Sequence, residues 1–305
     1  MAVPASAFLI LLAMGLIWGL QVAMLKLSLS TGYSELQLIL VSLMLVAVTY
    51  FCVLVVRRGL FSFTGSRLKF FLSTALLGYV IPLCAILYAG HTIAAGMLSL
   101  IISTAPLFTF AAAFLGGTEA ISRLRMVAMA LGFMATTLVL WPEFVTPGFG
   151  DIGWLLLMLL VPICYGVESV YIDFKWPEGL DVYQIGFGEV VVAAFLVIPL
   201  LIWQGEPLVF NWTWDTSHTA ILVYSFTGIS EVVMYFHLIR TTGGVLVAFA
   251  TPVALFGGIG WGMLVFNESH SNWVWVAVAV LFISLVLVGV DARKPKQHVD
   301  VTHPS

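Results

Sequence analysis

Residues 18–21 read Trp-Gly-Leu-Gln, and 147 positions later residues 165–168 read Tyr-Gly-Val-Glu, each inside a long apolar run. The same offset pairs Gln37 with Gln184, and further matches follow at a near-constant offset through four pairs of apolar runs. Self-similarity at a fixed offset is the signature of an architecture built from repeated units. The sequence therefore predicts two related halves.

The apolar runs around these motifs dominate the composition. Of 305 residues, 61% are hydrophobic and 9% are charged, with a mean hydropathy of +1.10 and a net charge of -3. A soluble domain is about half apolar and about a quarter charged. So few charges cannot coat a water-soluble particle, which excludes a soluble enzyme, a nucleic-acid-binding protein and a disordered chain. We expect a polytopic membrane protein.

Ten apolar segments are long enough, at about 20 residues, to cross a bilayer as helices. They lie at 5–26, 35–56, 68–88, 92–115, 122–141, 152–172, 183–203, 217–238, 243–266 and 272–291. Five spans per repeat is an odd number, so the second copy is inserted upside down relative to the first. This predicts an all-α membrane protein of ten transmembrane helices, in two inverted five-helix repeats around a central cavity. The repeats are residues 1–147 and 148–291, followed by a cytoplasmic tail at 292–305.

The distribution of Lys and Arg predicts the orientation. Eleven of the 12 basic residues lie in the even-numbered connections and the tail, and only Lys26 lies in an odd-numbered one. Cytoplasmic loops of membrane proteins carry the excess of Lys and Arg. Both termini are therefore expected in the cytoplasm, with the chain crossing the inner cell membrane several times.

The segment Ala94–Ser122, AAGMLSLIISTAPLFTFAAAFLGGTEAIS, combines small residues, a mid-span Pro and a closing Glu. With the five-plus-five spans and the aromatic-Gly pair of the first span, it resembles the EamA-type repeat of the drug/metabolite transporter superfamily. Thr242–Ser271 is a looser second copy, and the resemblance covers residues 5–291. It implies a ten-helix basket that carries amino acids, nucleobases, organic cations or sugars, often outward in exchange for protons. Many relatives carry an Arg in the second span, where this chain has Val41-Ser42.

Three glutamates fall within the apolar segments, and ionisable groups inside a bilayer are functional candidates by default. Glu231 shares a helix face with Tyr235 and is the first candidate for binding an amino group or exchanging a proton. Glu168 is the second candidate. Glu189 is expected to pair with a cytoplasmic Arg, because the resemblance places its helix at the periphery. A purely structural interpretation of these carboxyls stays open.

The remaining candidates are aromatic or hydrogen-bonding side chains on the helices expected to line the cavity. The predicted substrate-binding residues are Trp18, Gln21, Tyr79, Tyr88, Tyr165, Glu168, Glu231, Tyr235 and Trp261. Pro106 and Pro252, at corresponding places in the two repeats, are predicted hinges for gating, together with Glu231 and Glu168 as coupling residues. Glu268 immediately precedes the last span and is expected to cap that helix.

The leading hypothesis is a secondary active transporter, an exporter, of small polar or amphipathic metabolites, with amino acids favoured. It would work by alternating access, with protons as a candidate coupling ion. An organic-cation or drug transporter of the same fold is the alternative, and a passive channel or an intramembrane enzyme would belong to another class. No H-E-x-x-H, G-x-S-x-G or Walker A motif is present, so no catalytic residue, metal or cofactor is expected. The expected partners are a small-molecule substrate, the lipid bilayer and protons, but no nucleic acid, with the chain as a monomer or weak homodimer.

Overall fold

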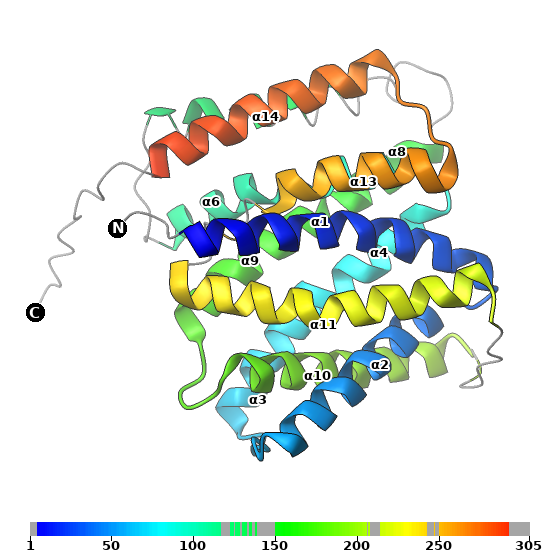
Figure 1. Ribbon diagram of the computed structural model, residues 1–305, viewed down its shortest axis with the longest axis vertical. Coiled ribbons are helices and arrows are strands. Elements are labelled where there is room, and N and C mark those ends of the chain that lie inside the picture. The colour runs from blue at the N-terminus through cyan, green and yellow to red at the C-terminus, as the bar shows by residue number, and fades with distance from the viewer. Residues whose placement is uncertain are drawn as a thin grey trace, which may run out of the picture.

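The computed structural model describes residues 5–116, 150–205, 214–242 and 250–292, together with Pro207, Val247 and scattered residues between 123 and 138. Every element assigned in this part of the chain is a helix (Figure 1). The expected span 122–141 lies largely outside the described residues, and residues 293–305 of the expected tail lie wholly outside them.

The described helices coincide with the remaining apolar segments, and three of those segments, at 68–88, 92–115 and 152–172, change helix type or break along their length. In the first half the elements are α1 (Ala5–Ser28), the 3₁₀ turn η1 (Leu29–Thr31), α2 (Glu35–Val56), α3 (Gly65–Thr74), the π-helical η2 (Ala75–Val80), α4 (Ile81–Gly90), α5 (Ala95–Ile102) and α6 (Ala105–Leu115). In the second half they are α8 (Gly150–Met158), α9 (Leu160–Lys175), α10 (Val182–Trp203), α11 (Thr216–Thr242), α13 (Ala250–Phe266) and α14 (Asn272–Ala292).

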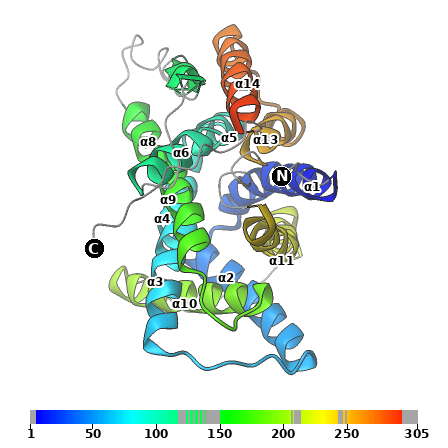
Figure 2. The ribbon, with the colours of Figure 1, turned by 90° about the vertical axis from the view of Figure 1, so that its left-hand side faces the viewer.

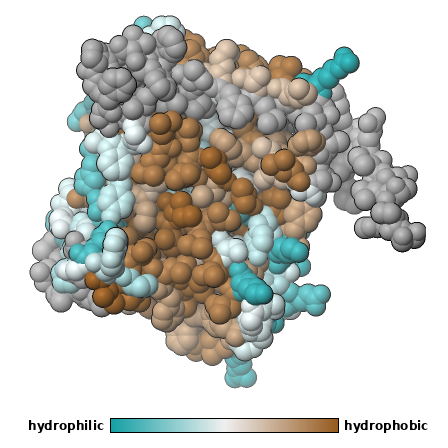
Figure 3. All heavy atoms as spheres, turned by 180° about the vertical axis from the view of Figure 1, so that it is seen from behind, coloured by the Kyte–Doolittle hydropathy of each residue, from teal (hydrophilic) through white to brown (hydrophobic). Residues whose placement is uncertain are grey.

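Seven helical segments of the described chain are long and apolar enough to cross a membrane. They are Ser6–Thr31, Glu35–Val56, Gly65–Gly90, Ala95–Leu115, Gly153–Lys175, Val182–Trp203 and Thr216–Thr242. Two further apolar helical stretches are shorter, Val253–Phe266 and Asn272–Ser284. Figure 3 shows the matching surface, with a broad apolar area between two hydrophilic margins. All regular elements in the described part of the protein are thus helices, and several of them are suited to a lipid bilayer.

Helices of the two halves pack against each other in corresponding pairs. α1 lies against α13 and α11, while α9 lies against α6 and the α3–η2–α4 segment. α2 packs along α10, and Figure 2 shows this pair at one end of the molecule with α1, α11 and α13 on one side and α4, α6 and α9 on the other. The contact of α1 with α13 and the contact of α9 with α6 thus each join a helix from the first half of the chain to a helix from the second half.

Two glycines, one in each half of the chain, allow the backbones of these helices to touch. A Cβ on Gly19 of α1 would lie 2.7 Å from the backbone oxygen of Ala254 in α13. A Cβ on Gly166 of α9 would lie 2.6 Å from the backbone nitrogen of Thr109 in α6. Small residues let membrane helices approach until their backbones touch, which maximises packing between them. These two glycines are 147 residues apart in the sequence, and both lie at a backbone-to-backbone contact between helices.

Matching capping boxes begin α2 and α10. Ser34 and Gln37 exchange side-chain and backbone hydrogen bonds at the start of α2, as Asp181 and Gln184 do at the start of α10. Each Gln also bonds to the chain just beyond the end of the other helix of the pair. Gln37 Nε2 donates to the carbonyl of Pro207 at 2.9 Å, beyond the end of α10, and Gln184 Nε2 donates to the carbonyl of Gly59 at 2.8 Å, beyond the end of α2. The antiparallel pair is therefore joined at both ends.

The close contact at Gly19 predicts a stability difference between two glycine substitutions. Gly19→Ala forces α1 away from the α13 backbone, and such overpacking lowers the free energy of unfolding by about 1–3 kcal/mol. Gly260→Ala is the matched control, because a Cβ there meets nothing within 4 Å. Alanine at that position should be neutral or stabilise the helix by about 0.5–1 kcal/mol. Thermal unfolding of the detergent-solubilised chain measures both, and equal unfolding temperatures for the two variants would contradict the packing account.

Candidate functional site

An internal cavity of about 110 Å³ lies where α1, η2, α4, α5, α6, α9, α10, α11 and α13 meet. This space holds several water molecules or one small solute. Its polar and aromatic lining residues are Trp18, Gln21, Tyr79, Ser99, Thr109, Tyr165, Glu168, Ser169, Glu189, Tyr224, Glu231 and Tyr235. Three of them are carboxylic acids, and none of the described lining residues is Lys, Arg or His.

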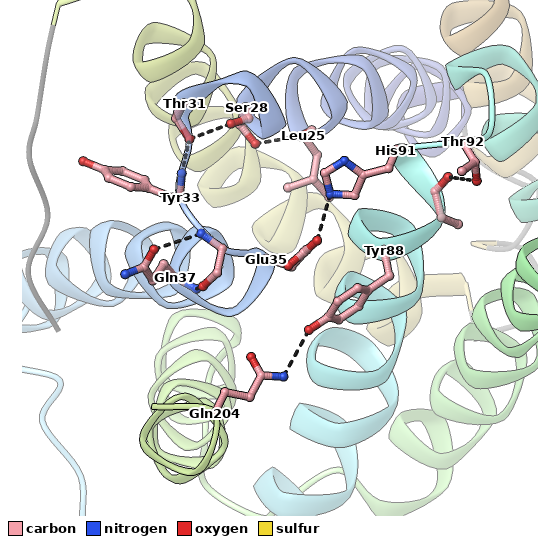
Figure 4. A network of polar contacts seen from close by, with 12 residues as sticks. Leu25, Ser28, Thr31, Tyr33, Glu35, Gln37, Tyr88, His91, Thr92 and Gln204 are labelled. Atoms are coloured by element: carbon pink, nitrogen blue, oxygen red, sulfur yellow. Dashed lines mark hydrogen bonds and ion pairs between the residues drawn. The ribbon is translucent and has the colours of Figure 1, made fainter. Parts of the chain in front are cut away.

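The cavity brings together most of the side chains predicted to bind substrate. Those that line it are Trp18, Gln21, Tyr79, Tyr165, Glu168, Glu231 and Tyr235. Tyr88 lies elsewhere, at the far end of α4, where its hydroxyl accepts a hydrogen bond from Gln204 Nε2 at 3.3 Å (Figure 4). Trp261 of α13 is on the exterior, with 37% of its surface exposed.

Of the two predicted hinge prolines, the structure describes the surroundings of Pro106 only. Pro106 lies in the first turn of α6, directly after Ser103 and Thr104 interrupt the helix between α5 and α6. Ile102 and Ala105, on either side of this break, both line the cavity. Pro106 thus follows a real discontinuity, since proline is well tolerated in the first turn of a helix. Pro252 falls within the bounds of α13, but its side chain lies outside what the structure describes.

Glu168 and Glu189 form the most buried acidic part of the cavity. Only 4% of Glu168 and 1% of Glu189 are exposed. The two carboxyls, carried by α9 and α10, are within hydrogen-bonding reach of one another. Tyr235 donates a hydrogen bond to Glu168 Oε2 at 3.4 Å. Among the described residues, no donor reaches Glu189 Oε1.

Glu231 occupies a second position in the cavity, on α11. It is half-buried, and the side chain of Trp18 approaches its carboxyl. Tyr235 follows Glu231 by one helical turn and bonds to Glu168, so it links the two acidic positions. The cavity therefore has two acidic positions. Glu231 lies beside the indole ring of Trp18, and the Glu168–Glu189 pair is linked to it by Tyr235.

Stacked aromatic rings form one wall of the cavity. The rings of Trp18 and Tyr165 are stacked, with centroids 6.4 Å apart and an interplanar angle of 11°. The ring of Tyr235 lies against the same indole at 6.2 Å. Faces of such rings attract cations through their quadrupole. The wall and the carboxyls thus favour the same class of ligand.

The π-helical segment η2 borders the cavity next to the carboxyl of Glu168. A Cβ on Gly78 would collide with the carboxyl of Glu168, so a larger residue there would move that carboxyl. Tyr79, the next residue, lines the cavity, and Thr74 just before η2 has its hydroxyl near Glu189. Single π-helical turns inside α-helices are frequent at functional sites. Here the extra residue of the π turn places Gly78 and Tyr79 beside the carboxyl pair.

Glu189 and Tyr224 were not among the predicted binding residues. Glu189 was expected to pair with a cytoplasmic Arg, whereas its carboxyl lies in the cavity next to Glu168. One signal in the sequence could have found it. No basic residue stands within one helical turn of Glu189 in either direction, so a carboxyl at that depth needs a partner from another helix.

A second polar cluster lies beyond the end of α13. Glu268 Oε1 is 3.0 Å from Lys26 Nζ, and its two oxygens accept hydrogen bonds from the backbone N–H groups of Ala95 and Gly96 at 2.8 and 3.1 Å. Glu268 was expected to cap the helix that follows it, but it caps α5 of the other half instead. The carboxylate fits between α13 and α5 because Gly262 has no Cβ, which would collide with it, while Gly96 leaves room for the ring of His270.

The helix ends near this cluster carry other polar contacts. His91 Nε2 lies 2.8 Å from Glu35 Oε1, and Tyr88 meets Gln204 nearby (Figure 4). These groups join α2 and α10 to α4 at one margin of the apolar surface. These groups are separate from the cavity, and the bonds between them do not involve Glu168, Glu189 or Glu231.

No protein-family model matches the chain, and no curated protein sequence matches it. A crystal structure described only as that of a protein has a similar fold. It superposes with a TM-score of 0.63 at 18% sequence identity, over 95% of this chain and 99% of that one. At this identity the likeness shows a shared fold and carries no information on function.

The Glu268 cluster predicts a pH effect on stability. Burial raises the pKa of Glu268, but the N–H groups of Ala95 and Gly96 and the ammonium of Lys26 outweigh it and hold the pKa below its ordinary value of 4.5. A lowered folded-state pKa stabilises the fold above the unfolded pKa, and this contribution is lost as the pH falls through the folded value. We expect the unfolding temperature to fall on acidification below about pH 4.5, with a smaller fall in Glu268→Gln. The exposed Glu178→Gln is the control, and identical pH profiles for wild type and Glu268→Gln would contradict the assignment.

Proposed function

We propose that the chain is a secondary membrane carrier for a small metabolite that bears a positively charged amino group. The observation that carries this proposal is the presence of three carboxylic acids in one buried cavity, among described lining residues that include no Lys, Arg or His. An ionised carboxyl in a low-dielectric interior requires a countercharge. A bound ammonium group supplies that charge.

Glu231 is the proposed binding residue for the ammonium group. It is less buried than Glu168 and Glu189, and the aromatic wall begins beside it at Trp18. A cation held between a carboxylate and an indole face gains from both the charge and the ring quadrupole. Tyr165 and Tyr235 extend the same wall along the substrate.

The charges of the lining residues also favour some substrate classes over others. An amino acid brings a carboxylate as well as an ammonium group, and no basic side chain of the described lining is available to meet that carboxylate. Simple amines and small organic cations need only the negative charges and the aromatic rings. We therefore place amines and organic cations ahead of the amino acids that the family resemblance favours.

Alternating access is the proposed mechanism, in a ten-helix fold of two inverted repeats of the drug/metabolite transporter type. The exchanged helix contacts support it, because α1 packs on α13 as α9 packs on α6. The two capping boxes, 147 residues apart and bonded reciprocally across α2 and α10, support it further. Two equivalent halves can exchange conformations, so that inward-open and outward-open states have similar energies. We also propose that both termini lie on the cytoplasmic side of the inner membrane and, from the family resemblance, that transport is outward.

The proposal predicts which ligands stabilise the purified chain. A thermal-unfolding screen should include tetramethylammonium, monoamines, diamines, neutral amino acids and small carboxylic acids. A ligand at about 100 times its Kd stabilises by roughly 2.7 kcal/mol. We expect amines or quaternary ammonium ions to raise the unfolding temperature in wild type and in the exposed control Glu178→Gln.

The substitution Glu231→Gln should abolish that stabilisation while leaving the unfolding temperature without ligand close to that of wild type, because the amide has the same shape as the carboxyl. Stabilisation that survives unchanged in Glu231→Gln would contradict its role. Stabilisation by the carboxylic acids alone would contradict the substrate class.

A further inference from the structure

We propose that Glu168 and Glu189 share a single proton and form the proton-exchange site of the carrier, separate from Glu231, which holds the substrate cation. This inference rests on the proposed function. It assigns a role to Glu189 and divides the cavity into two sites with different ligands.

The first step of the argument is the geometry of the pair. Glu168 on α9 and Glu189 on α10 lie within hydrogen-bonding reach, at 4% and 1% exposure. At this depth water cannot screen either charge. Two adjacent carboxylates in such a place repel each other, so that one of them holds a proton, as in paired-carboxylate sites generally.

The second step is the set of groups facing the pair from each packed element. From α3 and η2 these are Thr74 and Tyr79, and from α2 it is Tyr50. From α11 they are Tyr235 and Glu231. Cys164 and Tyr165, on the same helix as Glu168, also face the pair. All except Glu231 are neutral in their ordinary protonation states, and Glu231 adds a further negative charge.

The third step is a missing hydrogen-bond donor. Glu189 Oε1 is buried without a donor among the described residues. Three nearby hydroxyls donate to other acceptors, since Tyr50 donates to the carbonyl of Ile229 at 2.9 Å, Thr74 to the carbonyl of Phe70 at 3.2 Å, and Tyr235 to Glu168. A proton held between Glu168 and Glu189 supplies the donor that this oxygen lacks.

The fourth step connects the pair to the substrate. Tyr235 lies one helical turn from Glu231 and bonds to Glu168, so the two sites are adjacent but distinct. When a monovalent cation binds at Glu231, its positive charge favours the fully ionised pair, and the shared proton leaves. One cation enters and one proton departs, so the charge of the cavity is unchanged. In the reverse step the returning proton expels the cation.

The pair can be tested without any substrate. Infrared difference spectra of the full chain in phosphatidylcholine liposomes, with ¹³C-labelled glutamate, report protonated carboxyl groups directly. At neutral pH we expect a protonated carboxyl band in wild type, in Glu231→Gln and in the control Glu178→Gln. The band should be lost in Glu168→Gln and in Glu189→Gln, because the amide donates to the remaining carboxylate and no like charge opposes it. A band that persists in Glu189→Gln, or is absent from wild type, would overturn the shared proton.

A second measurement tests the coupling with tetramethylammonium, a permanent cation that carries no proton of its own. In wild type its affinity should rise about tenfold per pH unit through the range where the pair titrates, because binding releases one proton. This pH dependence should vanish in Glu189→Gln, and a pH dependence that remains there would overturn the coupling role. If tetramethylammonium has no effect while the infrared band behaves as expected, the proposed function fails and the proton pair stands.

Discussion

The cost of placing carboxyl groups in a low-dielectric interior without basic partners governs this structure. At an effective dielectric constant of about 20, two unit charges about 4 Å apart interact by roughly 4 kcal/mol. Glu168, Glu189 and Glu231 share one small cavity, and no described lining residue is basic. Such a cavity is stable only with protons or cations bound. The cavity carboxyls therefore need bound protons or cations, and these can exchange for one another.

The surrounding helices make this arrangement possible through close packing and local irregularity. Gly19 and Gly166 let α1 and α9 approach α13 and α6 to backbone contact. The π-helical η2 places Gly78 under the Glu168 carboxyl, where any larger residue would displace it. The break between α5 and α6 opens onto the same cavity. Features that weaken regular helices are thus gathered where the carboxyls lie.

Much of the helical layout could be predicted from the sequence, because apolar runs and capping residues carry strong local signals. The bounds 35–56 of α2 were predicted without error from the apolar run, and the structure adds a capping box of Ser34 and Gln37 at its start. Trp18 and Tyr165 were predicted to line the cavity as aromatic residues on cavity-lining helices, and Glu168 as an ionisable group inside an apolar segment; all three line it. The π turn and the α5–α6 break were not predicted, because they depend on packing with other helices.

The assignments that failed in detail concern long-range partners. Glu189 was expected to meet an Arg, and Glu268 was expected to cap its own neighbouring helix. Glu268 instead bonds to Ala95 in the other half of the chain, and Glu189 lies against Glu168 on another helix. Local sequence patterns carry no information on contacts at such separations. Tyr88 shares the spacing of Tyr235 in the repeat but lies at the end of α4 next to Gln204. Repeat symmetry predicts the position of a residue along a helix better than it predicts its surroundings.

The most direct test of the account is proton-driven transport of a permanent cation. Proteoliposomes with an acidic interior should accumulate radiolabelled tetramethylammonium from a neutral bath, because outward flow of protons through the carrier drives the cation inward. Collapse of the pH gradient with nigericin should abolish the accumulation. Uptake that is the same with and without the gradient, or the same in protein-free liposomes, would contradict a carrier whose buried carboxyls exchange protons for cations.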